Sequence, residues 1–339
     1  MINKYLFSAC LCLVVCTFTS AQYLHTPSDF DKVLEKSTSR YTIDASLKAA
    51  PKVDRPLVAK GWSAVLTADG ARLVAPDIRT EVSATKYRIK GDNFYEKGKF
   101  LKAASNYEKM MPTGKSDGDL LKRLADSYHK GGDLDKAIQW YNEAVDVNFI
   151  DFEAHQLLAA CYREKSDLNK AVRHITLAHL LNRNDPAILE VLKNYYEADG
   201  RHFVDYSFEP AYQLGQLNKA EIKLSYAGKP WEAYGKCKAV WKHEVKHREK
   251  MSRMSNAPID EVEEKECLLN AIIVYGRLDA TEQQAYPELK SLGFAIAKQN
   301  INDYILYEMK AVQEPLLISR LSRQKLLELA EFVKQLRTQ

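Results

Sequence analysis

A step of 34 residues recurs in the middle of this chain and restricts the folds open to it. Small, aromatic and turn-forming residues each return at this step. The series are Gly91, Ala125 and Ala159; Phe94, Tyr128 and Tyr162; Gly98, Gly132 and Ser166; and Ala103, Ala137 and Ala171. Tyr196 and Gly200 continue two of these series. A fixed period of this length indicates stacked units, because one short unit cannot bury its apolar face alone.

The residue types at these positions fit a unit of two short helices. The small residue of the first series lets the first helix approach the second, and the aromatic residue three positions later fills the space beside it. The Gly or Ser ends the first helix with a residue that tolerates a positive φ. The Ala of the last series lies where the two helices cross, and a larger side chain there would push them apart. The pattern therefore predicts a stack of helical hairpins.

This register resembles the tetratricopeptide repeat family over residues 84–206. The motifs that carry the resemblance are Gly91-x-x-Phe94-x-x-x-Gly98, Ala125-x-x-Tyr128-x-x-x-Gly132 and Ala159-x-x-Tyr162-x-x-x-Ser166. The resemblance implies an all-α fold, a tetratricopeptide-like helical-hairpin solenoid, with units at 84–117, 118–151 and 152–185 and a partial unit at 186–206. After Gly200 the pattern fails, because Asp205 stands where the crossing Ala belongs.

The resemblance also implies a function. The family binds peptides and proteins in a groove lined by polar positions of the first helices, so we expect a non-enzymatic scaffold or adaptor that has no cofactor. By register, the groove positions are Arg88, Asp92 and Tyr95 in the first unit, Lys122, Asp126 and His129 in the second, and Gln156 and Arg163 in the third. Asp92 and Ala160 stand where the family's clamp for a partner's C-terminal carboxylates needs Asn. Lys122 and Asp126 lie four residues apart, so a mixed-charge peptide fits better than an acidic tail.

Residues 1–21 have the features of a secretory signal. Lys4 supplies its positive charge, Leu6 to Phe18 form an apolar stretch too short to span a bilayer well, and small residues end at Ala21. We expect cleavage before Gln22 and a mature chain with no transmembrane segment; the alternative is an uncleaved anchor. The sequence contains no Asn-x-Ser/Thr site, which favours a bacterial protein in the periplasm or associated with the outer membrane. For the scaffold that the family resemblance implies, we expect a setting in a secretion, motility or cell-wall assembly.

Residues 22–83 precede the repeats as an N-terminal arm. Ser28 begins a short helix with Phe30 and Leu34 on its apolar side, and three prolines interrupt the rest. The stretches 62–67 and 71–74 flank Ala68-Asp69-Gly70, a pattern that fits a small hairpin. The alternative is an extended arm that lies along the solenoid.

Residues 207–339 are predicted to form a helical extension of diverged repeats that covers the end of the stack. Leu326, Leu329, Val333 and Leu336 mark the apolar side of its last helix. A helical hairpin turning near Asn256 would leave Cys237 and Cys267 about 13 Å apart along the helix axis. A disulfide needs Cα atoms within about 7 Å, so we expect free, buried thiols. A structural subunit bound through this region is a further possibility.

One motif points to a different class of protein. His243-Glu244-Val245-Lys246-His247 matches the His-Glu-x-x-His spacing that puts two imidazoles on one helical face for zinc, with the Glu as general base, and resembles the zincin signature. A zinc-dependent hydrolase is therefore the alternative function. Against it, the two His point away from the apolar stripe that holds Trp241 and Val245, toward solvent. Glu261, Glu263 or Glu264 could supply a third ligand, but this run is interpreted as the solvated start of the next helix, and we assign no metal site.

The composition excludes several other classes. A hydrophobic share of 46% and a charged share of 28% are those of a globular protein, not of a disordered chain. The net charge of +4 is too small to indicate nucleic acid as a partner. The basic residues of 236–253 are explained by pairing with nearby acidic residues. The sequence contains no nucleophile elbow, phosphate loop or dinucleotide fingerprint.

Overall fold

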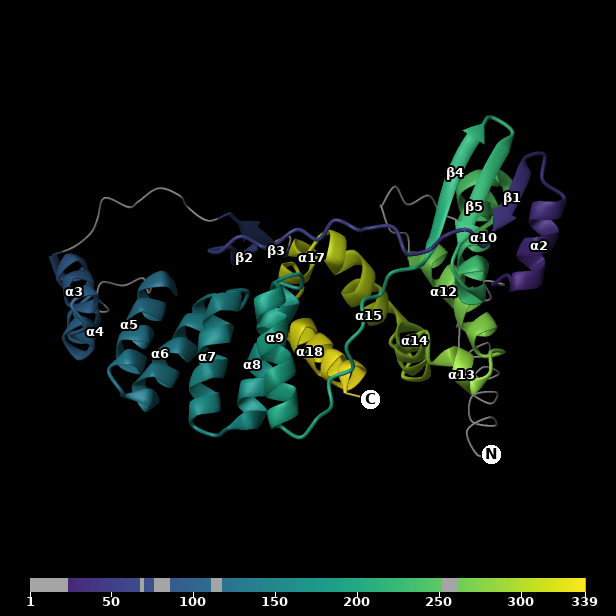
Figure 1. Cartoon of the computed structure of the whole chain (residues 1–339). Coiled ribbons are helices and arrows are strands. Elements are labelled where there is room, and N and C mark those ends of the chain that lie inside the picture. Colours follow the sequence, from purple (N-terminus) through teal and green to yellow (C-terminus); the bar gives the residue numbers. More distant parts are fainter. Residues whose placement is uncertain (1–23, 68–69, 76–85, 111–117, 252–260, 339) are drawn as a thin grey trace. The chain divides into compact units, whose positions relative to one another are not determined.

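The computed structural model describes residues 24–67, 70–75, 86–110, 118–251 and 261–338 (Figure 1). The predicted secretory signal lies outside these residues. The described chain forms two compact units. Unit 1 comprises residues up to Asp54 and Asp205–Lys310, and unit 2 comprises Arg55–Val204 and the residues from Ala311 onward. Within the described ranges, no helix combines the length and the apolarity that a membrane crossing requires.

Unit 2 is built from antiparallel helical hairpins. Its helices are α3 (Lys86–Glu96), α4 (Phe100–Glu108), α5 (Gly118–Lys130), α6 (Leu134–Val147), α7 (Phe152–Glu164), α8 (Leu168–Leu181) and α9 (Pro186–Ala198) (Figure 1). The turns after α3, α5, α7 and α9 each hold one residue of positive φ: Gly98 (67°), Gly132 (84°), Ser166 (62°) and Gly200 (75°). These four residues lie 34 apart, so the predicted register and the predominantly helical solenoid are confirmed.

The core of unit 2 follows the same register. Ala103, Ala137 and Ala171 have no exposed surface, as expected where two helices cross. At Gly91 the helices approach so closely that an added Cβ would lie 2.4 Å from the Tyr107 ring. The helices begin on aspartate caps: the side chains of Asp133, Asp151, Asp167 and Asp185 accept backbone N–H groups at the starts of α6, α7, α8 and α9.

The end of the repeat stack is covered by a segment that lies far from the repeats in the sequence. After α9 the chain leaves unit 2, and it returns through α16 (Ala311–Gln313) and α17 (Leu316–Ser319) to α18 (Arg323–Arg337). Helix α18 packs against α8, and its apolar side chains, which include Leu329 and Val333, are buried. Only the last part of the predicted 207–339 extension therefore belongs with the repeats.

Residues 55–74 combine the two alternatives considered for the N-terminal arm. Strands β2 (Ser63–Thr67) and β3 (Gly70–Val74) pair as an antiparallel hairpin. The segment before them is extended along the ends of the repeat helices. The backbone N–H of Val58 donates to the Asn182 side chain at 3.0 Å, and Asn148 donates to the Trp62 carbonyl at 2.8 Å. Because Asn148 and Asn182 lie 34 residues apart, the arm follows the repeat spacing.

Unit 1 contains a three-stranded sheet that the helical prediction for residues 207–339 missed. Strand β1 (Arg40–Asp44) pairs in parallel with β5 (Glu221–Tyr226), and β5 pairs antiparallel with β4 (Tyr212–Asn218). The helices of unit 1 are α2 (Pro27–Glu35), α10 (Lys229–His243), α11 (Val245–Met251), α12 (Glu261–Tyr275), α13 (Ala280–Gln283), α14 (Pro287–Ala297) and α15 (Ile301–Ile305), which continues into a π-helical turn, η2 (Leu306–Lys310). Helices α10 and α12 pack together and form its centre (Figure 1).

The expectation of free thiols in this unit was wrong. Cys237 on α10 and Cys267 on α12 form a disulfide, with their Cα atoms 5.2 Å apart, and both are fully buried. The expectation assumed one straight helix as far as Asn256. Instead α10 ends at His243. Helix α12 packs along α10, and Cys267 lies opposite Cys237. Cys161 in unit 2 is the free, buried cysteine among the described residues.

Candidate binding face and a histidine–glutamate cluster

The eight predicted groove positions lie on α3, α5 and α7, the first helices of the three units. Seven of them are half-buried, and Arg163 is exposed with its guanidinium 5.9 Å from the centre of the Tyr195 ring. Gln156 on α7 is one of these seven. We call the surface formed by these positions on the three helices the first-helix face.

The polar side chains of this face bridge each first helix to the next. Arg88 lies 3.5 Å from Asp119, and the Tyr95 hydroxyl donates to Asp126. His129 is paired with Glu164 at 2.7 Å. The partners are 31 or 35 residues apart, close to one repeat, because neighbouring first helices stack side by side. The mixed charges of the face are therefore explained by pairs between neighbouring first helices of the same chain, which the choice of groove positions did not predict.

Two of the predicted groove residues serve the fold. Asp92 accepts a hydrogen bond of 2.6 Å from the hydroxyl of the buried Tyr107. Lys122 lies 2.8 Å from Asp151, which also caps α7, and 3.5 Å from Glu153. Burial by itself lowers the pKa of the Lys122 ammonium, but attraction to these two carboxylates outweighs burial and raises that pKa. A substitution at Lys122 would therefore disturb the solenoid as well as any partner.

Other residues of the face could have been found from the repeat register. Lys130 donates to the Tyr95 hydroxyl, lies 4.6 Å from the centre of that ring and is paired with Asp126 at 3.2 Å. Burial, together with the hydrogen bond to Asp126, raises the pKa of the Tyr95 hydroxyl, so it remains a donor at neutral pH. Adding 31 or 35 to Arg88, Tyr95 and His129 identifies their partners Asp119, Asp126, Lys130 and Glu164, which the choice of register positions alone only partly includes.

The helix that carries the His-Glu-x-x-His motif is broken inside the motif. Helix α10 ends at His243, Glu244 leaves helical geometry (φ −97°, ψ 89°), and α11 begins at Val245. The Glu244 carboxylate accepts hydrogen bonds of 2.7 Å from the hydroxyls of Ser37 and Tyr41. The two histidines therefore do not share one helical face, and the zincin geometry is absent.

The break also reverses which side chains are buried. Val245, expected to be buried, is 52% exposed, and His247, expected to face solvent, is 7% exposed. Glu264, expected in the solvated start of the next helix, is only 2% exposed. The expectations for Val245 and His247 were wrong because they extended one helical periodicity through Glu244. Glu264 is buried because Tyr234 and Lys238 on α10 pair with its carboxylate.

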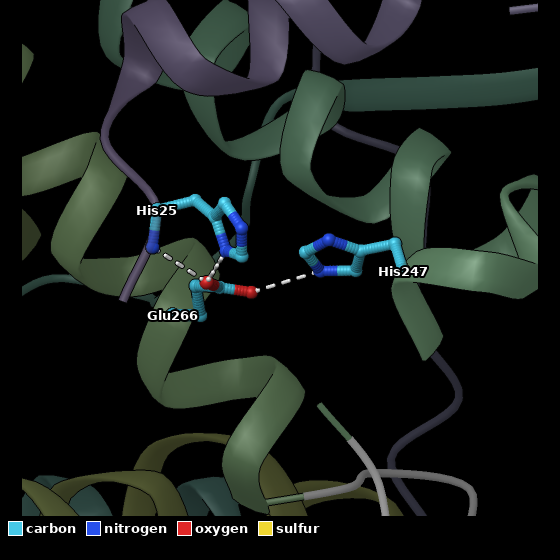
Figure 2. Close-up of side chains that lie close together, drawn as sticks. All are labelled: His25, His247 and Glu266. Atoms are coloured by element: carbon cyan, nitrogen blue, oxygen red, sulfur yellow. Dashed lines mark hydrogen bonds and ion pairs between the residues drawn. The ribbon is translucent and has the colours of Figure 1, made fainter. Parts of the chain in front are cut away.

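His247 joins a buried cluster instead (Figure 2). Its Nε2 lies 3.3 Å from Glu266 Oε2, and His25 Nδ1 lies 3.0 Å from Oε1 of the same carboxylate. The His25 backbone N–H (2.8 Å) and the Trp241 indole N–H (2.6 Å) donate to Glu266 as well. Burial by itself raises the pKa of Glu266, but hydrogen bonds from His247, His25 and Trp241 outweigh it and hold the pKa below its usual value.

Comparison with solved structures returns repeat domains at low similarity. The first TPR domain of Spaghetti (RPAP3) bound to an HSP90 peptide is 21% identical, matches 36% of this chain and 99% of that one, and has a TM-score of 0.33. The Yersinia enterocolitica type III secretion chaperone SycD with a peptide of the translocator YopD is 22% identical over 36% of this chain and 95% of that one, with a TM-score of 0.32. The TPR2AB domain of yeast Sti1 is 17% identical over 74% and 90%, with a TM-score of 0.30. No family model and no curated protein match the chain.

Proposed function

We propose that this protein is a non-enzymatic adaptor of the bacterial envelope that binds a peptide or protein segment on its first-helix face. The observation that carries the proposal is the placement of charged and aromatic side chains at equivalent positions of α3, α5 and α7, outside the packed core. The crossing residues that hold each hairpin together are fully buried alanines on the second helices. Apart from Asp92 and Lys122, which pair within the fold, the polar side chains of the first-helix face are therefore proposed to contact another molecule.

The charges of the face set the chemistry of the partner. Asp119, Lys130 and Glu164 belong to its ion pairs, and their side chains are 46–54% exposed. Such exposed pairs contribute about 0–1 kcal/mol each, so a partner can replace them at small cost. A segment with alternating charges can pair with both partners of each bridge, which supports a mixed-charge peptide. Tyr95 adds an aromatic contact of the kind that strengthens interfaces.

The disulfide supports the proposed compartment. Disulfides persist in the periplasm and other oxidising environments and are rare in the reducing cytosol. Cys237 and Cys267 are both buried, so the bridge is part of the core of unit 1. Together with the predicted secretory signal, it supports export to the periplasm or the outer membrane and a place in a secretion, motility or cell-wall assembly.

The test is a charge reversal on the first-helix face. In-cell crosslinking first identifies the captured partner. Lys130→Glu with Arg163→Glu then removes two exposed positive charges from that face. Capture should weaken by tenfold or more, about 1.4 kcal/mol, while the melting temperature changes little. Lys122 is left intact, because its pairing with Asp151 stabilises α7.

The matched control reverses two exposed lysines of the second helices. Lys102→Glu on α4 with Lys136→Glu on α6 makes the same change in net charge. Capture by this control should equal that of the wild type. Loss of capture in the control alone would place the partner on the second helices and refute the proposal. Truncation after residue 206 is not a suitable test, because it removes α18 from its contact with α8.

A further inference from the structure

Three side chains with metal-binding atoms meet inside unit 1. His25 precedes α2, His247 lies on α11 and Glu266 lies on α12, and Figure 2 shows both rings beside the same carboxylate. The donor atoms all lie within 4.8 Å of one another. Tetrahedral zinc with bonds of about 2.0–2.1 Å holds its ligand atoms about 3.3 Å apart. His25 Nδ1 lies 3.0 Å from Oε1 and His247 Nε2 lies 3.3 Å from Oε2, so the two imidazoles approach different oxygens of one carboxylate. Side-chain rotations that bring one oxygen and both ring nitrogens from their present spread of up to 4.8 Å to about 3.3 Å would complete the ligand set.

The charge of Glu266 also points to a cation. The carboxylate is fully buried, and a buried charge is costly unless it is paired. The donors that the structure places on it are the His25 backbone and ring, the Trp241 indole and the His247 ring. A divalent ion in contact with the carboxylate would pair directly with its buried charge.

We propose that His25, His247 and Glu266 form a binding site for a divalent transition-metal ion, with zinc the best fit. Two imidazoles and one carboxylate are a ligand set that zinc takes in sites with three protein ligands and one open position. Calcium and magnesium prefer oxygen ligands and fit this set poorly. The His25 side chain is 11% exposed, so the site lies at the edge of the core and can take a water as its fourth ligand.

The surroundings hold the three ligands in place. Trp241 donates to Glu266 Oε2, and Asn270 donates to the His25 carbonyl at 2.9 Å. The rings of Phe30 and Trp241 lie 5.5 and 5.3 Å from the His247 ring and shield it from water. The Cys237–Cys267 bridge joins α10 to α12 beside Glu266. Partners of this kind orient metal ligands, and their loss commonly weakens metal binding by about 10–100-fold.

This site differs from the zincin arrangement that the sequence motif predicts. Glu244, the general base of that motif, is hydrogen-bonded to Ser37 and Tyr41, and the described cluster does not include His243. The site therefore fastens the segment before α2 to α11 and α12. It is confined to unit 1, whereas the first-helix face belongs to unit 2, so the two proposals can fail independently.

The experiment measures zinc binding by the purified full chain. A C-terminal tag without histidines leaves His25 undisturbed and adds no ligand. After removal of metal with a chelator, titration with Zn²⁺ should give one ion per chain and a higher melting temperature for unit 1. Co²⁺ in its place should give the intense visible absorption of a tetrahedral site. A wild-type chain that binds no stoichiometric zinc, or a Co²⁺ spectrum typical of six oxygen ligands, would overturn the proposal.

Variants separate this site from the motif. Glu266→Gln preserves the size of the side chain but removes its charge, and it should weaken zinc binding more than tenfold. His25→Ala, at the edge of the core, gives the same test if Glu266→Gln does not fold. The matched control is His243→Ala, which removes a histidine of the motif that lies outside the cluster and should bind zinc like the wild type. Unchanged affinity in His25→Ala, or lost affinity in His243→Ala, would also overturn the proposal.

Discussion

The disulfide between α10 and α12 offers a quantitative test of how unit 1 is held together. The bridge closes a loop of 30 residues. By the chain-entropy relation, such a loop stabilises the folded state by about 3.5 kcal/mol, because it restricts the unfolded chain. Replacing Cys237 and Cys267 together by alanine should therefore destabilise unit 1 by about 3–4 kcal/mol. Alanine is chosen because a buried serine would add an unpaired hydroxyl.

The measurement must report each unit separately, because two units need not unfold together. Native-state hydrogen exchange resolves individual helices. In the double variant, amides of α10 and α12 should exchange from a state that is about 3–4 kcal/mol less stable. Amides of α5 to α8 should keep their wild-type protection. The matched control is Cys161→Ala, which removes a buried thiol from unit 2 without opening a loop.

Two results would refute this reasoning. Thiol titration of the denatured, unreduced chain should find one free thiol among Cys161, Cys237 and Cys267. Three free thiols in protein taken from the envelope would remove the bridge and its support for an oxidising compartment. A double variant whose α10 and α12 amides are as stable as in the wild type, within about 0.5 kcal/mol, would show that the loop entropy does not stabilise unit 1.

Two further predictions concern unit 2. His155 and His174 share a hydrogen bond of 2.9 Å, and burial lowers their pKa values to about 4 and about 3. Both histidines stay neutral in the folded state, whereas the unfolded chain takes up protons below a pKa of about 6.5. The free energy of unfolding is therefore unaffected by these histidines above that pH. It falls as the pH is lowered, by about 2 kcal/mol per histidine at pH 5. Denaturant unfolding at pH 7.5 and pH 5 measures the loss. His155→Leu with His174→Phe should remove the share of these two histidines, whereas the buried His179, whose pKa is also lowered by burial, keeps its own share; an undiminished loss in that variant would contradict the assignment. Ala137→Leu should destabilise the solenoid by about 1–3 kcal/mol through overpacking at a fully buried crossing, whereas Glu143→Ala on the exposed side of α6 should change stability by less than about 0.5 kcal/mol. Equal melting temperatures of the two variants would count against the register.

The repeat register was predictable because its causes are local. A positive φ at Gly132, a small residue at the helix crossing and an aspartate at a helix start each act within one hairpin, and the same solution returns one repeat later. The groove positions on α3, α5 and α7 follow from that register. Their bridging partners one repeat further along could have been derived from the same spacing. The use of these positions by a partner stays a prediction.

The structure of unit 1 depended on contacts that no local pattern contains. Ser37 and Tyr41 hydrogen-bond to Glu244 across 207 and 203 residues, at the point where α10 ends. That helix end decides that Cys237 meets Cys267, that Val245 is exposed and that His247 turns toward Glu266. His25 reaches the same carboxylate from 241 residues away. Periodicity within the chain determined the solenoid, because each hairpin repeats the same short-range packing, whereas only tertiary pairing over long sequence separations decided the sheet, the disulfide and the buried cluster.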